Sequence, residues 1–389
     1  MDFTFTPEEL AFRDEVRAFL DRELPAGWDG FDDLMETPPQ EQEAFAARFR
    51  KKLVERGWLA MAWPKEYGGR EASVMQQLLF NEEMAYRRAP VGFSMGIAWV
   101  GPALMLYGTE EQKRRYLPPI VRDEETWCTL YSEPGAGSDL AALQTRAVRD
   151  GDEYVINGQK IWTSGAHRSQ LGWLAARTDP DAPKHKGISM FIVEMDRPGI
   201  TVRPLINMAG DHGFNEVFFE DVRIPADHLV GVENRGWYQL AVALDFERSS
   251  IGSAAGSQRT LEDLAAYARE HRAEVTGPAR AALAERFIEV EVARNLAYRV
   301  AWLQSKGQVP NYEASLVKTY SAELSQRIAR TGLALLGLYG QLAPGSKWAR
   351  LRGRLEHAYL SSVSATIAGG TSEINRSVIA TRGLGLPRA

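Results

Sequence analysis

The spacing of apolar residues divides the chain into a helical part, a strand-rich part and a second helical part. Up to about residue 120, apolar positions recur at helical spacing, which is typical of helices with one buried face. Thr6-Pro7-Glu8-Glu9 predicts a capped helix start, and Thr109 before two glutamates predicts another. The helices expected here carry the apolar positions of 10–20 and 45–54, and span 73–88, 92–107 and 110–119.

From about residue 125 to 225 the spacing of apolar residues changes. Short apolar runs are separated by turn residues, which predicts strands of a compact β-barrel or sandwich. Asn157-Gly158 lies between two extended runs and predicts a hairpin turn. The strands expected in this part lie at 127–131, 171–177, 188–193, 216–219 and 222–225.

Helical spacing returns after Asn234 and continues nearly to the end. The long apolar faces favour a four-helix bundle, with helices expected at 235–270, 279–305, 312–339 and 347–368 and a short one after Gly370. The predicted fold class is therefore α+β, with three domains in the order α, β, α. They are an N-terminal α-helical domain at 1–122, a middle β domain at 123–232 and a C-terminal helical bundle at 233–389.

Composition narrows the class of protein. With 389 residues, 44% hydrophobic and 25% charged, the chain has the composition of a globular protein, and a net charge of −5 favours neither nucleic acid nor an anionic membrane as partner. Its one cysteine, Cys128, lies in a strand-like run and is expected to be buried rather than nucleophilic. Without a signal-peptide pattern or a membrane-length apolar run, a cytoplasmic protein is expected. The six histidines lack metal-ligand spacing, so no catalytic metal is expected.

Four motifs carry the candidate chemistry. The first is Tyr131-Ser132-Glu133-Pro134-Gly135-Ala136-Gly137-Ser138-Asp139-Leu140, a strand end followed by a turn. Composition alone favours a plain surface turn there. The others are Asn157–Ser164, Leu244–Arg248 and Gly369–Arg376. In this order and at these separations, the motifs resemble those of the acyl-CoA dehydrogenase family of flavoenzymes, and the resemblance covers nearly the whole chain.

The resemblance implies FAD as cofactor, held largely by the middle domain. Trp162 would lie beside the flat isoalloxazine ring, although a core or interface tryptophan is the alternative. Ser164, with Thr163 adjacent, would supply the donor that flavin N5 needs. The residues implied to bind FAD are Tyr131, Ser132, Gly137, Ser138, Trp162, Thr163, Ser164 and Thr371.

The resemblance also bears on the catalytic base. Most family members place a glutamate directly before the glycine-threonine pair of the last motif, where this chain has Gly369. A subset, including isovaleryl- and long-chain acyl-CoA dehydrogenases, places it on a C-terminal-domain helix before an arginine, as in Glu247-Arg248. Glu247 is therefore the predicted base, and Arg248 is predicted to bind the CoA portion, with a solvated helix-surface pair as the alternative. Ser138, Gly369 and Gly370 complete the substrate contacts implied.

Two motifs depart from the family pattern. The Arg-x-x-Phe-Gly motif, which in family homotetramers reaches the neighbour's FAD, is replaced by Ala268–Val275. The later Gly-Gly-x-Gly turn appears as Gly337-Leu338-Tyr339-Gly340. Other donors could replace the missing groups, or a related subunit could supply them. The chain most resembles a bacterial subset with heteromeric members, some acting on CoA thioesters of steroid side chains.

The function that the resemblance implies is α,β-dehydrogenation of an acyl-CoA thioester to trans-2-enoyl-CoA, a step of lipid β-oxidation. Electrons would pass to an electron-transfer flavoprotein. The expected assembly is a homotetramer or dimer of dimers, or a heterotetramer with a related subunit. The alternatives are a catalytically silent or partner-dependent subunit of a heteromeric enzyme, an acyl-CoA oxidase, and a flavin monooxygenase on the same fold.

Overall fold

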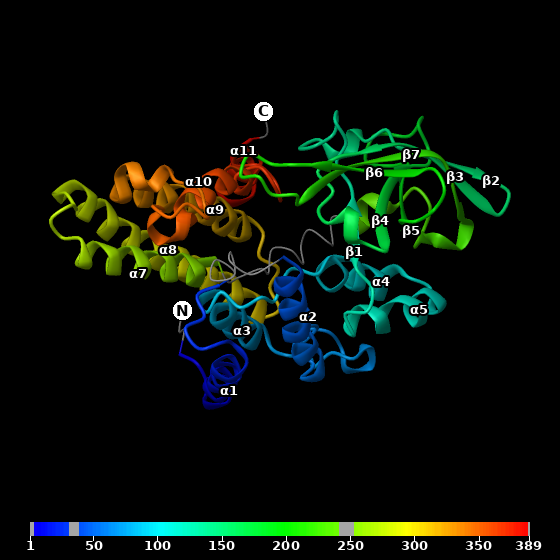
Figure 1. The fold of residues 1–389 in the computed structure, drawn as a ribbon. Helices are drawn as coiled ribbons and strands as arrows, with labels where there is room; N and C mark the ends of the chain where they lie inside the picture. Colours follow the sequence, from blue (N-terminus) through cyan, green and yellow to red (C-terminus); the bar gives the residue numbers. More distant parts are fainter. Residues whose placement is uncertain (1–3, 31–38, 241–252, 388–389) are drawn as a thin grey trace. The chain divides into compact units, whose positions relative to one another are not determined.

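The computed structural model describes residues 4–30, 39–240 and 253–387. Their contacts form two compact units, each drawn in Figure 1. The helical unit consists of the described parts of 1–53, 70–92 and 248–389, and the sheet unit of those of 54–69 and 93–247. Among the described residues, no helix has both the length and the apolar character needed to span a membrane.

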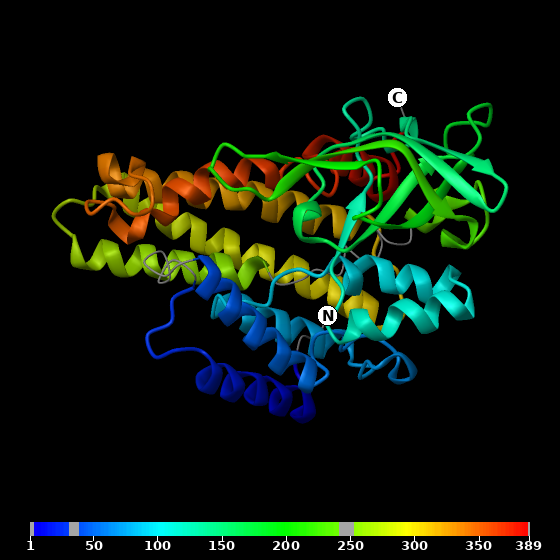
Figure 2. The same ribbon diagram turned by 45° about the vertical axis from the view of Figure 1, so that its right-hand side comes forward.

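The helical unit contains the predicted bundle. Helices α7, α8, α9 and α10 lie side by side in both views (Figures 1 and 2), with Leu261, Val290 and Ile328 among the residues of their shared core. Helix α3 packs against α7 and α8, and α1 packs against α3. The helices are α1 (Pro7–Glu23), α2 (Pro39–Glu55), α3 (Val74–Tyr86), α7 (Ser253–Glu270), α8 (Gly277–Ser305), α9 (Tyr312–Leu336), α10 (Arg354–Ala365) and α11 (Ser372–Val378).

An ionic cluster joins distant segments of the helical unit. Asp29, which follows α1, and Asp263 on α7 each accept hydrogen bonds from guanidinium groups. The three arginines are Arg88, Arg259 and Arg354, and their side chains are 13–30% exposed. Burial raises the pKa of Asp29, but the three arginines outweigh burial and hold it below its ordinary value. The cluster therefore ties the N-terminal segment to the bundle.

The sheet unit is built on one eight-stranded sheet, seen in green in Figure 1. The order is β6-β7-β3-β2-β4-β5-β8, and β1 pairs parallel with β4. The strands are β1 (Trp127–Leu130), β2 (Arg146–Asp150), β3 (Glu153–Lys160), β4 (Leu171–Arg177), β5 (Ile188–Glu194), β6 (Ile200–Leu205), β7 (Phe214–Pro225) and β8 (Leu229–Val230). Two helices, α4 (Gly101–Tyr107) and α5 (Glu110–Val121), belong to the same unit.

Strand β4 is buried on both faces, which explains its unbroken apolar sequence. Trp173 and Ala175 point into one core cluster together with Leu104 of α4 and Leu117 of α5. Leu174 and Ala176 join a second cluster on the opposite face, together with residues of other strands of the sheet such as Ile156 and Phe191. The α, β, α order and the α+β fold class are thus confirmed.

The predicted hairpin turn at Asn157-Gly158 is wrong. Strand β3 runs through both residues, and the hairpin turn is Gly151-Asp152, between Asp150 and Glu153. Gly158, at φ 151°, lies where the β3–β7 register shifts, and a Cβ there would lie 2.5 Å from Thr145 Oγ1. The glycine is therefore required by a close approach inside the sheet rather than by a turn.

Several predicted boundaries also move. The strands expected at 216–219 and 222–225 are one strand, β7, which continues through Asp221 at φ 50°. The helix expected at 92–107 starts with a π-helical turn, Gly96–Val100, before α4. Helix α9 stops at Leu336 because Gly337 has a φ of 59°, and α10 begins only after Leu351 and Arg352, both at positive φ. Residues 241–252 of the helix expected at 235–270 lie outside the described residues.

Candidate functional site

The first motif forms a tight turn at the end of β1. Glu133 and Ala136 exchange two backbone hydrogen bonds of 3.0–3.1 Å, and Gly135 at the tip has no atom within 4 Å of where a Cβ would be. The Tyr131 ring stacks on Trp99, with centroids 6.2 Å apart and planes 11° apart. Gly137 and Ser138 follow the turn and are exposed. Of the predicted contact residues of this loop, Gly137 and Ser138 are therefore open to solvent, whereas Tyr131 and Ser132 are half-buried.

A buried ion pair between Lys160 and Glu133 holds the loop of the first motif in place. Lys160, fully buried at the end of β3, donates to Glu133 Oε1 at 2.8 Å and to the Tyr131 carbonyl at 3.0 Å. Burial lowers the pKa of Lys160 to about 8. Burial opposes charge on Glu133 as well, but Lys160 and two backbone N–H donors hold the pKa of Glu133 below its ordinary value. The pair was missed from the sequence, although a lysine at an inward-facing strand position is its signal.

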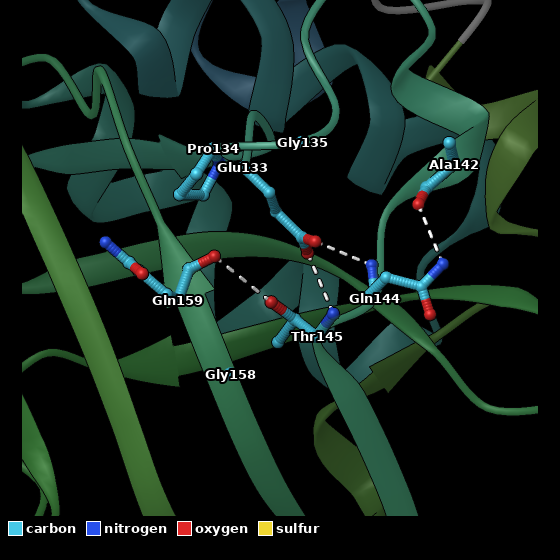
Figure 3. A pocket seen from close by; sticks show the side chains of 8 residues that line it. All are labelled: Glu133, Pro134, Gly135, Ala142, Gln144, Thr145, Gly158 and Gln159. Carbon is cyan, nitrogen blue, oxygen red and sulfur yellow. Dashed lines mark hydrogen bonds between the residues drawn. The ribbon is translucent and has the colours of Figure 1, made fainter.

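The Glu133 side chain also borders a surface hollow of about 320 Å³. Figure 3 shows its carboxylate accepting from the backbone N–H groups of Gln144 and Thr145, at 2.6 and 2.8 Å. Thr145 Oγ1 in turn lies 3.4 Å from the Gln159 carbonyl. The hollow is thus walled by the first motif and β3.

A second hollow, of about 420 Å³, has three basic residues in its lining, Arg146, Arg177 and Lys184, beside uncharged ones. Arg177 has a structural role, because its guanidinium donates to the backbone carbonyls of Ala141 and Leu143. Lys184 instead forms an exposed pair with Asp139 at 2.8 Å. Its ammonium remains accessible to an anion.

The second motif ends in a strained turn that carries Trp162. This residue has a φ of 60°, which costs a bulky residue roughly 1–2 kcal/mol. Trp162 is 60% exposed, and its indole and the Phe214 ring meet edge to face, with centroids 6.1 Å apart. Trp162 is therefore not a core residue of this chain, and the interface alternative stays open. The fold holds an aromatic face toward solvent at an energetic cost.

Thr163 and Ser164 follow Trp162 and differ in exposure. Thr163 is 1% exposed, and its hydroxyl has no hydrogen-bond partner among the described residues. Ser164 is half-buried, and Gly165 beside it has open space where a Cβ would be. An exposed indole, adjacent hydroxyls and an uncrowded backbone fit a flat, mostly apolar ring with polar edge atoms, such as a flavin.

A cluster behind this turn was not foreseen from the sequence. Asn215 of β7 is fully buried, and its side-chain amide donates to the Thr163 carbonyl at 3.0 Å and to His167 Nδ1 at 3.1 Å. His212 Nε2 lies 2.9 Å from Asn215 Oδ1, and the two imidazoles stack with centroids 3.9 Å apart. Their positions 45 residues apart in sequence gave no signal.

The last motif forms a separate turn in the helical unit. Gly369 and Gly370 have φ values of 63° and 89°, and Thr371 caps α11 by accepting from the Ile374 N–H at 3.2 Å. Lys318 of α9 donates to the Gly370 carbonyl at 2.6 Å, and Asn375 donates to it at 2.9 Å. Lys318 and Asn375 thus fix the backbone of Gly369 and Gly370, and the positive φ values favour glycine at both positions.

The predicted base and its neighbour, Glu247 and Arg248, lie outside the described residues. Their roles stay predictions. In the part of the chain that is described, no group of three or more His, Cys, Asp or Glu side chains could hold a metal ion. The predicted FAD residues fall into two sets: those from Tyr131 to Ser164 in the sheet unit, and Thr371 in the helical unit.

Comparison with known proteins identifies the family. Family models of the acyl-CoA dehydrogenase N-terminal, middle and C-terminal domains match residues 6–124, 128–222 and 234–384. The chain belongs to the acyl-CoA dehydrogenase family. It is therefore an FAD-binding flavoprotein and an oxidoreductase acting on the CH–CH group of an acyl-CoA, in a family whose members are typically tetramers.

Relatives within the family point to a bacterial branch. The acyl-CoA dehydrogenase FadE26 of Mycobacterium tuberculosis is 37% identical, covering 100% of both chains. Two solved structures, a steroid acyl-CoA dehydrogenase, Tcur3481–Tcur3483, and the ChsE4–ChsE5 complex from Mycobacterium tuberculosis, each match with a TM-score of 0.87 and 36% identity, covering 100% of both chains. Both are described as pairs of different polypeptides.

Proposed function

We propose that this acyl-CoA dehydrogenase forms a trans-2-enoyl-CoA and passes the electrons to an electron-transfer flavoprotein. The observation that carries the proposal is the Trp162–Ser164 turn, in which the exposed Trp162 has a positive φ and the half-buried Ser164 lies close by in the chain. Bound FAD would accept hydride from Cβ of the thioester. Trp162 would cover one side of the ring and exclude water, and Ser164 would donate to the ring edge.

The proton chemistry is assigned to this chain's own residues. Glu247 would remove the proton from Cα, because the position used by most family members is Gly369, whose φ of 63° also disfavours any side chain. The Gly369 N–H would donate to the thioester carbonyl and stabilise the charge that develops there. Arg248 and Ser138 would bind the CoA portion, and Lys184 at the basic hollow offers a charge for a CoA phosphate.

The proposed substrate is a CoA thioester of a steroid side chain, and the proposed assembly is a heterotetramer with a related subunit. The substrate is supported by the solved relative that is named a steroid acyl-CoA dehydrogenase. The assembly is supported by the paired names of the two solved relatives and by the missing Phe-Gly motif at Ala268–Val275. At the altered glycine turn, Leu338 is 83% exposed. A homotetramer in which other donors hold FAD is the second candidate.

The experiment purifies the chain alone and together with candidate related subunits, and records the visible spectrum before and after anaerobic addition of acyl-CoAs. Bleaching of the flavin bands by a steroid side-chain thioester is the expected result. Rapid peroxide formation in air would instead indicate an oxidase.

Glu247→Gln keeps the shape of the side chain but removes proton acceptance. We expect it to retain flavin and to lower kcat by about 10²-fold or more. The control is Glu124→Gln, whose carboxylate pairs with Arg122 on the surface. Near-wild-type turnover of Glu247→Gln would contradict the assignment of the base.

A further inference from the structure

The hydrogen bonds around Asn215 use every polar atom of its side-chain amide. One N–H is donated to the Thr163 carbonyl, at 3.0 Å, and the other to His167 Nδ1, at 3.1 Å. The carbonyl oxygen accepts from His212 Nε2 at 2.9 Å. This arrangement requires His167 to be unprotonated at Nδ1, because Nδ1 is the acceptor.

Protonation of His167 at Nδ1 is incompatible with this arrangement. Two N–H groups would then face each other across 3.1 Å. The amide of Asn215 could restore a bond to His167 only by rotating its oxygen toward the imidazole. That rotation would remove the donor to the Thr163 carbonyl. The two segments would then be joined there by two backbone bonds of 3.0 Å, from the Thr163 N–H to the backbone carbonyl of Asn215 and from the Gly165 N–H to the Gly213 carbonyl.

We propose that His167, Asn215 and His212 are positioning residues that couple imidazole protonation to the placement of the Thr163–Ser164 backbone and of the Ser164 donor. The inference rests on the proposed function, because it takes Ser164 to face the flavin. When the imidazoles are neutral, Asn215 donates to the Thr163 carbonyl and holds the Trp162–Ser164 turn in place. On protonation Thr163 loses a hydrogen bond, the strained φ of 60° at Trp162 loses support, and Ser164 moves.

The surroundings of the His167 imidazole oppose its protonation. Burial, His212 and Arg168 lower the pKa of His167, in that order of effect, while the Asn215 hydrogen bond raises it. The other charged groups nearby are otherwise engaged: Asp211 accepts from Asn207, Arg203 of β6 lies over the Phe218 ring and Glu216 of β7 accepts from Gln159. The charged groups that lower the pKa of His167 are His212 and Arg168, and with burial they extend the neutral state of His167 below the ordinary histidine range.

The first test titrates the FAD-loaded full-length protein from pH 8 to pH 5 and follows flavin absorption and fluorescence. We expect a transition below about pH 6.5. His167→Asn places an amide oxygen near the position of Nδ1, so it keeps an acceptor for Asn215 but cannot titrate. It should abolish the transition. Asn215→Asp places a carboxylate between the imidazoles and should move the midpoint up by about one pH unit or more.

The matched control is His185→Gln, which removes an exposed imidazole that packs on Trp237 elsewhere in the sheet unit. It should leave the transition unchanged. A transition with the same midpoint in wild type, His167→Asn and Asn215→Asp would overturn the proposal. So would a flavin signal that stays constant across this pH range in the wild type.

A second readout does not depend on flavin. Hydrogen exchange of the peptide that spans residues 161–166, corrected for the intrinsic rate at each pH, reports the backbone N–H bonds of Ile161, Thr163 and Gly165, of which those of Thr163 and Gly165 go to the Gly213–Asn215 segment. As the pH is lowered, protection of this peptide against exchange should decrease in the wild type but not in His167→Asn. If the chain binds no flavin yet shows this pattern, the proposed function fails and the coupling stands. If an acyl-CoA bleaches the flavin but the exchange protection of this peptide does not change with pH, the proposed coupling fails and the proposed function stands.

Discussion

At the scale of single residues, we expect replacement of Lys160 to lower the stability of the protein strongly. It is fully buried and donates to both Glu133 and the Tyr131 carbonyl. Lys160→Met preserves most of the volume but leaves the Glu133 carboxylate buried without its partner. We expect a loss of about 3–5 kcal/mol in the free energy of unfolding, measured by urea denaturation.

The double variant Lys160→Met/Glu133→Gln separates the ion pair from packing. Removing the second charge should restore part of that loss, since an uncompensated carboxylate no longer has to be buried. Losses that simply add, with no coupling between the two positions, would contradict this account of the pair.

The pH dependence of stability follows from the same pair. Because the pKa of Glu133 is held below its ordinary value, the folded state binds fewer protons than the unfolded state at mildly acidic pH. The stabilisation by Glu133 is therefore fully present above about pH 4.5 and is lost as the pH falls through its folded pKa. The difference in unfolding free energy between wild type and Glu133→Gln should shrink between pH 6 and pH 3.5. Glu124→Gln, in a solvent-exposed pair, should show little such change.

At the scale of elements, the bulge in β3 makes a prediction that separates two glycines. Gly158 and Gly151 both have positive φ, but only at Gly158 would a Cβ meet another atom, 2.5 Å away. Gly151→Ala should cost about 1–2 kcal/mol, from backbone strain alone. Gly158→Ala should cost clearly more, because Thr145 must also move. Equal shifts of the thermal midpoint would argue against the close approach.

The elements that could be predicted from the sequence are those whose signals are local. The capping boxes of Thr6 with Glu9 and of Thr109 with Gln112 are present, so the starts of α1 and α5 were predictable. The need for glycine at position 158 of β3 was not predictable, because Thr145, which lies close to it, comes from another segment, just before β2. Strand order likewise depends on contacts that spacing does not encode.

The same distinction applies to the candidate site. The burial of Cys128 was predictable from a strand pattern. A motif singled out Trp162, but not the exposed turn that carries it. The roles of Lys160 and Asn215 were not, because each acts through residues far away in sequence. The assignments of the FAD and substrate residues, and the domain boundaries, stay predictions.

At the scale of the whole molecule, the ionic cluster at Asp29 and Asp263 links the N-terminal segment to the C-terminal bundle within the helical unit. Asp263→Asn keeps the shape but removes one of the two negative charges that face three arginines. We expect a loss of about 1.5–3 kcal/mol in unfolding free energy. Glu291→Gln on α8, which breaks a more exposed pair with Arg294, should cost under about 1 kcal/mol. Equal losses in the two variants would show that the cluster is no more than a surface network.

The single cysteine has a practical consequence for study of the assembled enzyme. Cys128 lies in β1 at 0% exposure, and burial raises the pKa of its thiol to about 12. The folded sheet therefore offers no thiolate to a labelling reagent near neutral pH. Labelling of Cys128 therefore reports an opening of the sheet, and no engineered probe is needed. Slower labelling after addition of FAD, an acyl-CoA or a second subunit would measure how strongly each stabilises the closed sheet.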